Sequence, residues 1–482
     1  MDIEEFRIHA HTFSDWMADY LASVEQYPVR SQVKPGEISA HIPVECPVQG
    51  EPMEAIFADF KEKILPGVTH WQHPRFFAYF SANSSPPSVL AEMLTATLAA
   101  QCMLWETSPA ATELEERMMV WLRDLLGLPS EFIGSIQDSA SASTLCGIIA
   151  ACEKATSGKA SREGLAGGPP LIVYASEEAH SSVEKGARIA GIGSKNVRKI
   201  PVRNDHGMDP EALAGAIAED RAAGRIPACI VACFGATGLG SVDPLAEIGR
   251  IARAEDIHLH VDAAWAGSAL ILPEVRATLA GLEYVDSFVF NPHKWLFTNF
   301  DCSAFYMRDP SRLASALSLT PTYLESDTDE GTPEYRDWSI ALGRRFRALK
   351  LWFVMRSYGA EEMRKMVRAH IQWTQHLAGL ISDTQHFEIA TEPRFALLTF
   401  RFTPEWASSD DEIDAVNEEL LRRINDSGRL YLTKTRANGR IVIRFVIGQT
   451  YTKLRHVEEG WACIQELARQ IPNPGHDASS LR

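Results

Sequence analysis

The chain has 482 residues, of which 45% are hydrophobic and 23% charged, a composition typical of a folded globular protein. Its 47 Lys and Arg against 63 Asp and Glu give a formal net charge of −16, which argues against nucleic acid as a partner. No stretch approaches the ~18 consecutive apolar residues of a membrane span, and the opening MDIEEFRIHAHTF lacks the regions of a signal peptide. We therefore expect a cytoplasmic protein with no membrane segment.

The eight cysteines are scattered, without a C-x-x-C pair or a His/Cys cluster at zinc spacing. Most lie in apolar runs such as CIVACF and CSAFYM, where cysteine behaves as a small buried hydrophobic residue. The pattern predicts reduced thiols and no bound metal.

The first segment, residues 1–85, is predicted to be a helical extension. Apolar residues at helical spacing predict an amphipathic helix over 3–25, and a second helix runs from Met53 to Pro66-Gly67. Between them, five prolines in residues 28–52 indicate an extended strap. Because these segments cannot bury their own apolar faces, we expect them to pack on a partner subunit.

Residues 86–349 are predicted to form one large α/β domain. Thr112 and Glu115 have the spacing of a capping box at a helix start. Short apolar runs then alternate with helical patterns; the runs are LIVYAS (171–176), CIVACF (229–234), IHLHVD (257–262), SFVF (287–290) and CSAFYM (302–307). This alternation predicts βαβ units and a mostly parallel sheet covered on both faces.

Residues 350–472 are predicted to form a small α+β domain. Strand patterns in FALLTFRF, RLYLTKT and RIVIRFVI are combined with helical patterns at 411–426 and 452–470. Residues 473–482 are interpreted as a tail.

Two polar residues follow strands of the large domain, at the edge where open α/β sheets bind ligands. Asp262 ends IHLHVD, where a carboxylate alone is as often a simple turn cap. Lys294 follows SFVF within NPHK; most loop lysines are merely solvated, but an apolar WLF follows this one. Such surroundings lower the pKa of an amine by desolvation and suit a lysine that forms a Schiff base.

Two further segments carry candidate groups. Residues 137–144, QDSASAST, place small and hydroxyl residues at a helix start, which suits a phosphate, although an ordinary Ser-rich cap has the same pattern. His180 follows LIVYAS and is equally compatible with a structural role. No glycine-rich nucleotide motif occurs at the required spacing. Pyridoxal 5′-phosphate needs a phosphate-binding segment (residues 137–144, called the phosphate cradle below), a flat group on its ring (His180), a carboxylate (Asp262) and a Schiff-base lysine (Lys294). The carboxylate keeps the pyridine nitrogen protonated.

The motifs resemble those of the group II pyridoxal-phosphate-dependent decarboxylases, in the branch that acts on aromatic L-amino acids such as DOPA and tryptophan. The resemblance extends over nearly the whole chain, and the motifs that carry it are HWQHPRFFAYF (70–80), SPAATELE (108–115), QDSASAST (137–144), AHSSVEKG (179–186), HVDAAWAG (260–267), NPHKW (291–295), NFDCSAFYM (299–307) and PTYL (321–324). It implies the fold-type I, aminotransferase-like architecture and an obligate homodimer with shared active sites.

The resemblance assigns roles to individual residues. Lys294 corresponds to the Schiff-base lysine, Asp262 to the partner of the pyridine nitrogen, and His180 to the imidazole stacked on the ring. The remaining cofactor contacts that it implies are Ser139, Ala140, Ser141, Thr237, Ala264, Asn291 and His293. Tyr323 corresponds to the loop tyrosine that, with His180, delivers a proton to Cα after CO₂ leaves.

The resemblance also bears on the reaction and its substrate. Relatives that form aldehydes carry Phe for the loop tyrosine or Asn for the stacking histidine, so Tyr323 and His180 favour decarboxylation to the amine. The ring pocket is predicted from Trp71, Tyr79, Phe80, Met103 and Gly343, with Met103 supplied by the neighbouring subunit. DOPA, tyrosine, phenylalanine, tryptophan and 5-hydroxytryptophan all stay open as substrates. An aldehyde synthase, a histidine decarboxylase and an inactive scaffold of the same fold are the alternatives.

Overall fold

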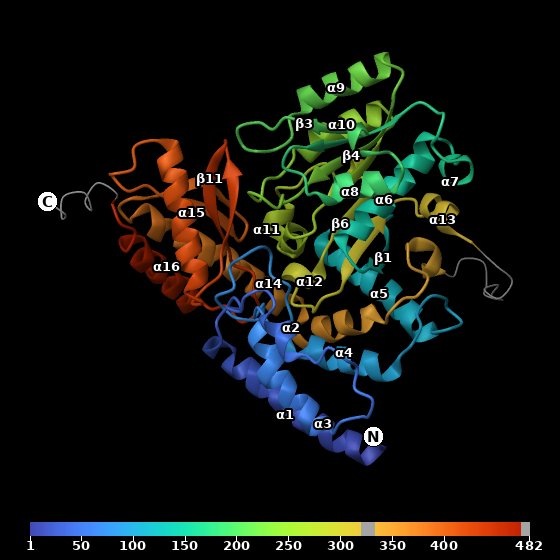
Figure 1. Ribbon diagram of the computed structural model, residues 1–482. Helices are drawn as coiled ribbons and strands as arrows, with labels where there is room; N and C mark the ends of the chain where they lie inside the picture. Colours follow the sequence, from blue (N-terminus) through green and yellow to red (C-terminus); the bar gives the residue numbers. More distant parts are fainter. Residues whose placement is uncertain (320–332, 474–482) are drawn as a thin grey trace. The chain divides into compact units, whose positions relative to one another are not determined.

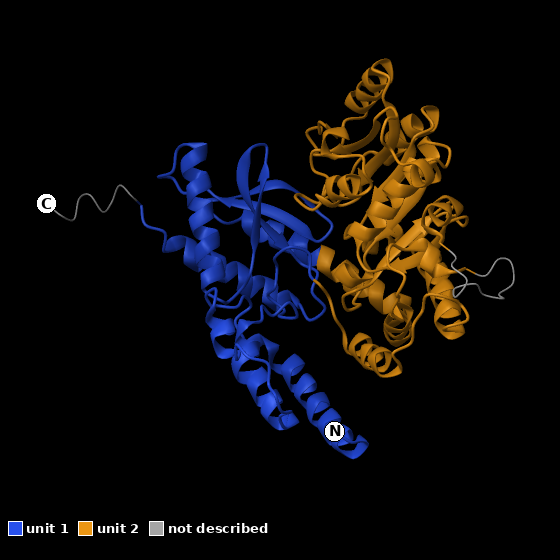
Figure 2. Cartoon of the chain, turned by 45° about the vertical axis from the view of Figure 1, so that its right-hand side comes forward, with its two compact units in different colours: residues 1–81, 372–482 blue, residues 82–371 orange. Residues whose placement is uncertain are grey.

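The computed structural model describes residues 1–319 and 333–473 of the chain. These residues divide into two compact units, one formed by residues 82–371 and the other by residues 1–81 together with 372–482 (Figure 2). Each unit is described by itself below. The domain boundaries predicted from the sequence stay a prediction.

The larger unit, residues 82–371, is built on a seven-stranded sheet in the order β1-β7-β6-β5-β4-β2-β3. Its strands are β1 (Ile133–Gln137), β2 (Leu171–Ser176), β3 (Val197–Ile200), β4 (Ile226–Cys233), β5 (His258–Asp262), β6 (Ser287–Phe290) and β7 (Ser303–Met307). Neighbours from β3 through β6 pair in parallel, whereas β7 is antiparallel to both β6 and β1. The predicted α/β class with a mostly parallel sheet is therefore confirmed.

Helices cover both faces of this sheet (Figure 1). On one face, α6 (Ala140–Ala155) and α8 (Ser182–Ile189) pack against Val173 of β2 and Val231 of β4. On the other, α9 (Pro210–Ala222) and α10 (Leu245–Ala254) contact β4, and Tyr174 donates a hydrogen bond to Asp220 of α9. Alternate residues of β2 thus face opposite layers, as the period-2 geometry of a strand requires.

The glycine at 147 allows α6 to lie close to the sheet. A β-carbon there would lie 2.9 Å from Nδ1 of His260 in β5, closer than real β-carbons approach. The His260 ring is fixed by a hydrogen bond between its Nδ1 and the hydroxyl of Ser287. A larger residue at 147 would therefore push α6 away from the strand that ends in Asp262.

The remaining α-helices that lie wholly in this unit are α4 (Pro86–Leu98), α5 (Pro109–Leu126), α7 (Ala160–Glu163), α11 (Pro273–Arg276), α12 (Pro292–Trp295) and α13 (Ser311–Leu317). The long α14 (Arg347–Ser382) begins here and has a non-helical residue, Gly359, in its interior. The predicted helix start at Thr112 is wrong. Because Pro109 has the fixed φ of a first helical position, α5 begins four residues earlier, with Ser108 in place of Thr112 as its N-cap.

The other unit contains a four-stranded antiparallel sheet in the order β10-β11-β9-β8. Its strands are β8 (Phe387–Arg394), β9 (Leu397–Phe402), β10 (Thr433–Ala437) and β11 (Arg440–Val446), and its helices include α1 (Ile3–Ser23), α2 (Glu37–His41), α3 (Met53–Asp59), α15 (Asp410–Asp426) and α16 (Leu454–Arg469). The amphipathic helix near the N-terminus is confirmed as α1. The predicted strap is interrupted by the short helix α2.

Two findings bear on the composition. Within residues 1–319 and 333–473, no helix has the length and apolar character needed to cross a lipid bilayer. All eight cysteines are free thiols, and only Cys46 is exposed.

Candidate active site

The predicted cofactor residues come together at one edge of the larger unit's sheet. Because β7 alone runs antiparallel, strands β1, β2, β4, β5 and β6 all end at this edge. The segments that follow β1, β2, β4 and β6 carry the phosphate cradle, His180, Thr237 and Lys294 respectively, and Asp262 is the last residue of β5. Open α/β sheets bind ligands in this position.

The pattern of exposure singles out predicted residues within otherwise buried segments. Ala264 is the one residue from Ile257 to Leu272 that is not buried, and Lys294 is the one from Ser287 to Thr298. Thr237, with its neighbour Gly238, likewise interrupts the buried segment that follows β4. Thr237, Ala264 and Lys294 are therefore partly accessible, although the segments around them are buried.

Hydrogen bonds fix the segments of Asp262 and Lys294 against one another. Oδ1 of Asp262 accepts the N–H of Ala264 at 3.0 Å, and the Ala264 carbonyl accepts the N–H of Asn291 at 2.9 Å. The Asn291 carbonyl in turn accepts the N–H of Lys294 at 2.9 Å. The side-chain amide of Asn83, which was not predicted from the sequence, donates to the Lys294 carbonyl at 2.5 Å.

His180 is held as a neutral ring with a defined tautomer. Its Nδ1 accepts the backbone N–H of Ser182 at 3.1 Å, so in the neutral ring the proton lies on Nε2. Partial burial lowers the pKa of His180; the charge of Lys294 adds to this effect, and the carboxylate of Asp262 opposes it. The electrostatic coupling of these three groups supports the predicted grouping of His180, Asp262 and Lys294.

The predicted phosphate cradle is the N-terminus of α6. Ser139 is its N-cap, and the Ser139 hydroxyl accepts the N–H of Ala142 at 3.2 Å. Ala140 and Ser141 occupy the first turn, where helix N–H groups have no partner within the helix. The fully buried Thr144 hydroxyl has no hydrogen-bond partner among the described residues. These donors suit an anion at the end of a helix.

His293 adds a neutral donor at the carboxyl end of β6. Its Nδ1 accepts the N–H of Cys302 at 2.9 Å, which leaves the proton on Nε2. Burial, aided by the neighbouring Lys294 charge, lowers the pKa of His293 to about 3. The Oδ1 atom of the buried Asn291 has no hydrogen-bond partner among the described residues. Both side chains therefore retain hydrogen-bonding capacity for a ligand.

Two of the predicted ring contacts, Met103 and Gly343, are brought together by their neighbours. The N–H of Cys102 donates to the carbonyl of Arg344 at 3.0 Å, and the N–H of Arg344 donates to Oε1 of Gln101 at 2.6 Å. A β-carbon at 343 would lie 3.3 Å from Nε2 of Gln101, a tight contact. A larger residue at 343 would thus have to displace the Gln101 amide.

The other predicted ring contacts form an aromatic cluster in the second compact unit. The rings of Trp71 and Tyr79 stack at 5.8 Å, and the Tyr79 hydroxyl hydrogen-bonds that of Tyr431 at 3.2 Å. The guanidinium of Arg444 lies 5.4 Å from the centre of the Phe80 ring. Tyr79 has φ 50°, a left-handed conformation that is uncommon for a bulky residue and is concentrated at functional sites. The part of Tyr431 in this cluster was not predicted, because its run RLYLTKT indicated only a strand.

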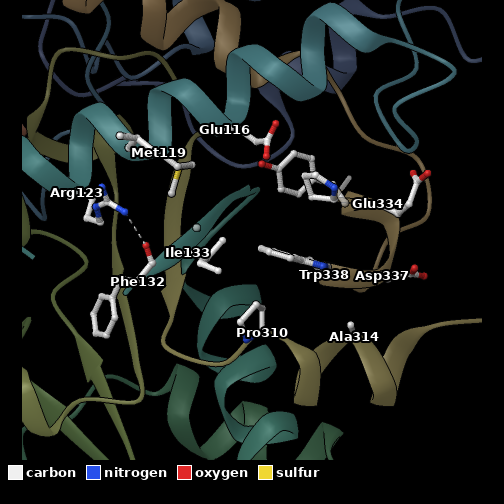
Figure 3. A pocket seen from close by; sticks show the side chains of 14 residues that line it. Glu116, Met119, Arg123, Phe132, Ile133, Pro310, Ala314, Glu334, Asp337 and Trp338 are labelled. Carbon is white, nitrogen blue, oxygen red and sulfur yellow. Dashed lines mark hydrogen bonds between the residues drawn. The ribbon is translucent and has the colours of Figure 1, made fainter. Parts of the chain in front are cut away.

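A separate cavity of about 510 Å³ lies beside α5 and α13 (Figure 3). Apolar residues such as Met119, Ile133 and Trp338 line it together with Glu116 and Asp337. It contains none of the residues predicted to bind the cofactor or substrate.

The predicted proton donor Tyr323 lies outside the described residues.

The buried histidines predict a loss of stability on mild acidification. Burial lowers the pKa values of five of them to about 3 or 4; they are His73, His258, His260, His293 and His370. In the unfolded chain these groups bind protons near pH 6.5, so below that pH the unfolded state binds more protons and stability falls. Each contributes up to about 1.4 kcal/mol per pH unit. Asp243, whose pKa burial raises to about 6, opposes this trend, and so do Glu116, Glu178 and Asp337, whose pKa values burial also raises.

We expect the thermal unfolding midpoint to be level between pH 7 and 8 and to fall steadily from pH 6.5 to 5. This window lies above the range in which carboxylates such as Glu419, with its pKa lowered to about 2, lose their ion pairs. A midpoint that stays constant down to pH 5 would contradict the neutral, buried state of these histidines.

Comparison with known proteins identifies the family. Residues 35–403 match the model of the pyridoxal-dependent decarboxylase conserved domain. The chain is 40% identical to tryptophan decarboxylase 2 of Oryza sativa subsp. japonica, covering 98% of this chain and 96% of the relative. It is 42% identical to phenylacetaldehyde synthase of Arabidopsis thaliana, covering 98% and 97%. Among solved structures, Oryza sativa TDC with PLP and tryptamine superposes with a TM-score of 0.94 at 33% identity, covering 98% of this chain and 99% of that one.

The chain therefore belongs to the pyridoxal-dependent decarboxylases. It is a carboxy-lyase whose cofactor is pyridoxal 5′-phosphate, as the motifs had implied. The residues present fit this group, because the unpartnered Thr144 hydroxyl and the partly exposed Ala264 and Lys294 lie in the segments that follow strands β1, β5 and β6 at one sheet edge.

Proposed function

We propose that the chain removes CO₂ from an aromatic L-amino acid to give the corresponding amine. The observation that carries the proposal is the convergence of Lys294, Asp262 and neutral His180 at the carboxyl edge of the sheet. Support for the aromatic class comes from relatives about 40% identical over nearly the full chain, which are tryptophan and tyrosine decarboxylases.

We assign the cofactor contacts as the sequence predicts them. Lys294 would hold pyridoxal 5′-phosphate covalently, and the carboxylate of Asp262 would pair with its pyridine nitrogen. His180 would cover one face of the ring and Ala264 the other. The phosphate would be bound by the α6 N-terminus with Asn291 and His293. When bound, the cofactor supplies an electron sink that stabilises negative charge at the substrate Cα.

The chain's own residues then control where the proton goes. The Nε2 proton of His180 is available because Nδ1 is occupied by the Ser182 N–H. We propose that Tyr323 acts with it to protonate Cα after CO₂ leaves. A general acid of this kind contributes about 10² to 10⁴ in rate.

The substrate ring would contact the aromatic cluster at Trp71, Tyr79 and Phe80, with Met103 and Gly343 as further contacts. A panel comprising tryptophan, 5-hydroxytryptophan, DOPA, tyrosine, phenylalanine, histidine and glutamate, with kcat/KM measured for each, tests this assignment. We expect an aromatic amino acid to lead and glutamate to give no turnover. A preference for histidine or glutamate would contradict it.

An aldehyde synthase is the second candidate, because phenylacetaldehyde synthases are as similar to this chain as the decarboxylases are. We expect wild type to give amine and the Tyr323→Phe variant to shift toward aldehyde, because Phe lacks the phenolic proton; dissolved O₂ is then the oxidant, and it is reduced to hydrogen peroxide while the amino group leaves as ammonia. Amine, aldehyde and hydrogen peroxide are measured together with CO₂. His180→Gln serves as the comparison, since it removes the second proposed donor. A Tyr323→Phe variant that still forms only amine at the wild-type rate would contradict the role of Tyr323.

We further propose a homodimer. None of the residues of α1 is buried, and its Ile3, Phe6 and Ile8 side chains are more than half exposed. In the larger unit, α4 also exposes apolar residues, among them Leu90 and Leu98. Exposed apolar patches of this kind mark protein interfaces. Light scattering should give twice the chain mass of 53.4 kDa, and a monomeric mass would contradict the proposal.

We infer that the protein is cytoplasmic. The support is its eight free thiols, which are typical of a reducing compartment. Cell fractionation tests this location, and recovery of the protein outside the cytoplasmic fraction would contradict it.

A further inference from the structure

A pair of stacked indoles connects the two segments that carry Asp262 and Lys294. Trp265 follows Ala264 directly, and Trp295 follows Lys294. Their ring centres are 4.9 Å apart with an interplanar angle of 17°, and both side chains are fully buried. The stack therefore joins the residues that directly follow Ala264 and Lys294, the two partly exposed positions of these segments.

Stacking alone does not prevent an indole from sliding in its own plane. A hydrogen bond, called the anchor below, holds the indole of Trp295 in place. Its Nε1–H donates to Nδ1 of His370, in α14, at 2.9 Å. The His370 ring lies nearly parallel to that of Trp295, at 11°, and also contacts Phe297. His370 is itself buried, and burial lowers its pKa to about 3, so its Nδ1 lone pair stays available as an acceptor.

We propose that His370 is a positioning residue of the cofactor site. Its Nδ1 fixes the indole of Trp295, and the fixed indole sets the place of Lys294 relative to Ala264. This inference rests on the proposed role of Lys294 as the residue that holds the cofactor. In this proposal His370 acts on the site through Trp295, to which it is hydrogen-bonded, and not as a contact of the cofactor or substrate.

Two variants of His370 separate anchoring from packing. His370→Asn keeps an acceptor near the position of Nδ1 but loses volume, whereas His370→Phe keeps volume and loses the acceptor. In the holoenzyme we expect His370→Phe to release the cofactor about tenfold faster, because the buried indole N–H is left unpaired. His370→Asn should stay within about twofold of wild type. If packing alone mattered, the order of the two variants would be reversed, and that result would overturn the proposal.

A spectroscopic measurement distinguishes positioning from a general loss of stability. The absorbance of the cofactor bound to Lys294 is followed against pH, and we expect its transition to shift in His370→Phe but not in His370→Asn. His456→Phe, which alters a buried histidine of α16, is the matched control and should leave the transition unchanged. A shift of equal size in this control would overturn the proposal.

The Trp295→Phe variant keeps the experiment decisive if His370→Phe does not fold. It keeps a stacking ring and removes the donor, so no buried N–H is left unpaired, yet the anchor is lost. We expect faster cofactor release here as well, and the double variant Trp295→Phe/His370→Phe should add little to it. Wild-type release from Trp295→Phe would overturn the proposal. Failure of borohydride to fix a cofactor on Lys294 in wild type would instead show that the proposed function is wrong, and the inference would fall with it.

Discussion

Replacing Lys294 by Arg is expected to abolish decarboxylation, with kcat lower by at least about 10³-fold. Arginine keeps the positive charge, but its guanidinium does not lose its proton in proteins and so cannot form the covalent bond to the cofactor. Borohydride reduction followed by peptide mapping should fix a pyridoxyl group on residue 294 in wild type and on no residue in Lys294→Arg.

The matched control is Lys195→Arg, the same substitution at an exposed position of the same unit. It should retain full activity and the adduct on Lys294. An adduct on another lysine of the wild-type protein, or turnover in Lys294→Arg within tenfold of wild type, would show that the assignment of Lys294 is wrong.

Replacing Asp262 by Asn is expected to produce the second largest effect, a fall in kcat of about 10² to 10³. The amide has nearly the same shape and its Oδ1 can still accept the Ala264 N–H, so the local backbone should persist. What is lost is the negative charge that keeps the pyridine nitrogen protonated, and with it the ability of the ring to take up charge from Cα.

The measurement combines steady-state kinetics with the absorption spectrum of the bound cofactor. Asp205→Asn, at an exposed turn, is the control and should match wild type in both. Asp262→Asn should still bind the cofactor on Lys294 but with an altered spectrum. If Asp262→Asn had the wild-type kcat and an unchanged spectrum, the assignment of Asp262 as the partner of the pyridine nitrogen would be wrong.

Much of the candidate site could be predicted because its residues directly follow buried strands. Asp262 closes β5 and Lys294 comes four residues after β6, and both strands are short apolar runs that stand out from the helical patterns around them. Local sequence also predicted a helix start within residues 137–144, since hydroxyl residues at a helix start are a local signal, and the structure has its N-cap at Ser139.

The parts that were not predicted depend on partners far apart in the sequence. The run CSAFYM does not reveal its direction, and only its pairing with β1 and β6 shows that β7 is antiparallel. Glu115 was interpreted as a capping residue, whereas the structure buries it in an ion pair with Arg344, 229 residues away.

The same limit applies within the site. The anchor of Trp295 is His370, which lies 75 residues further along the chain. The tautomer of His293 is set by the backbone N–H of Cys302, which a helix-and-strand pattern does not describe.

The central claim, decarboxylation of an aromatic amino acid to its amine, is tested most directly by product stoichiometry. The purified holoenzyme is supplied with the best substrate of the panel, and CO₂, amine, aldehyde and hydrogen peroxide are measured in the same reaction. With Tyr323 and His180 both present, we predict one amine for each CO₂ and only traces of aldehyde and peroxide. Aldehyde and peroxide formed in equal amounts with CO₂ would contradict the account and make the protein an aldehyde synthase.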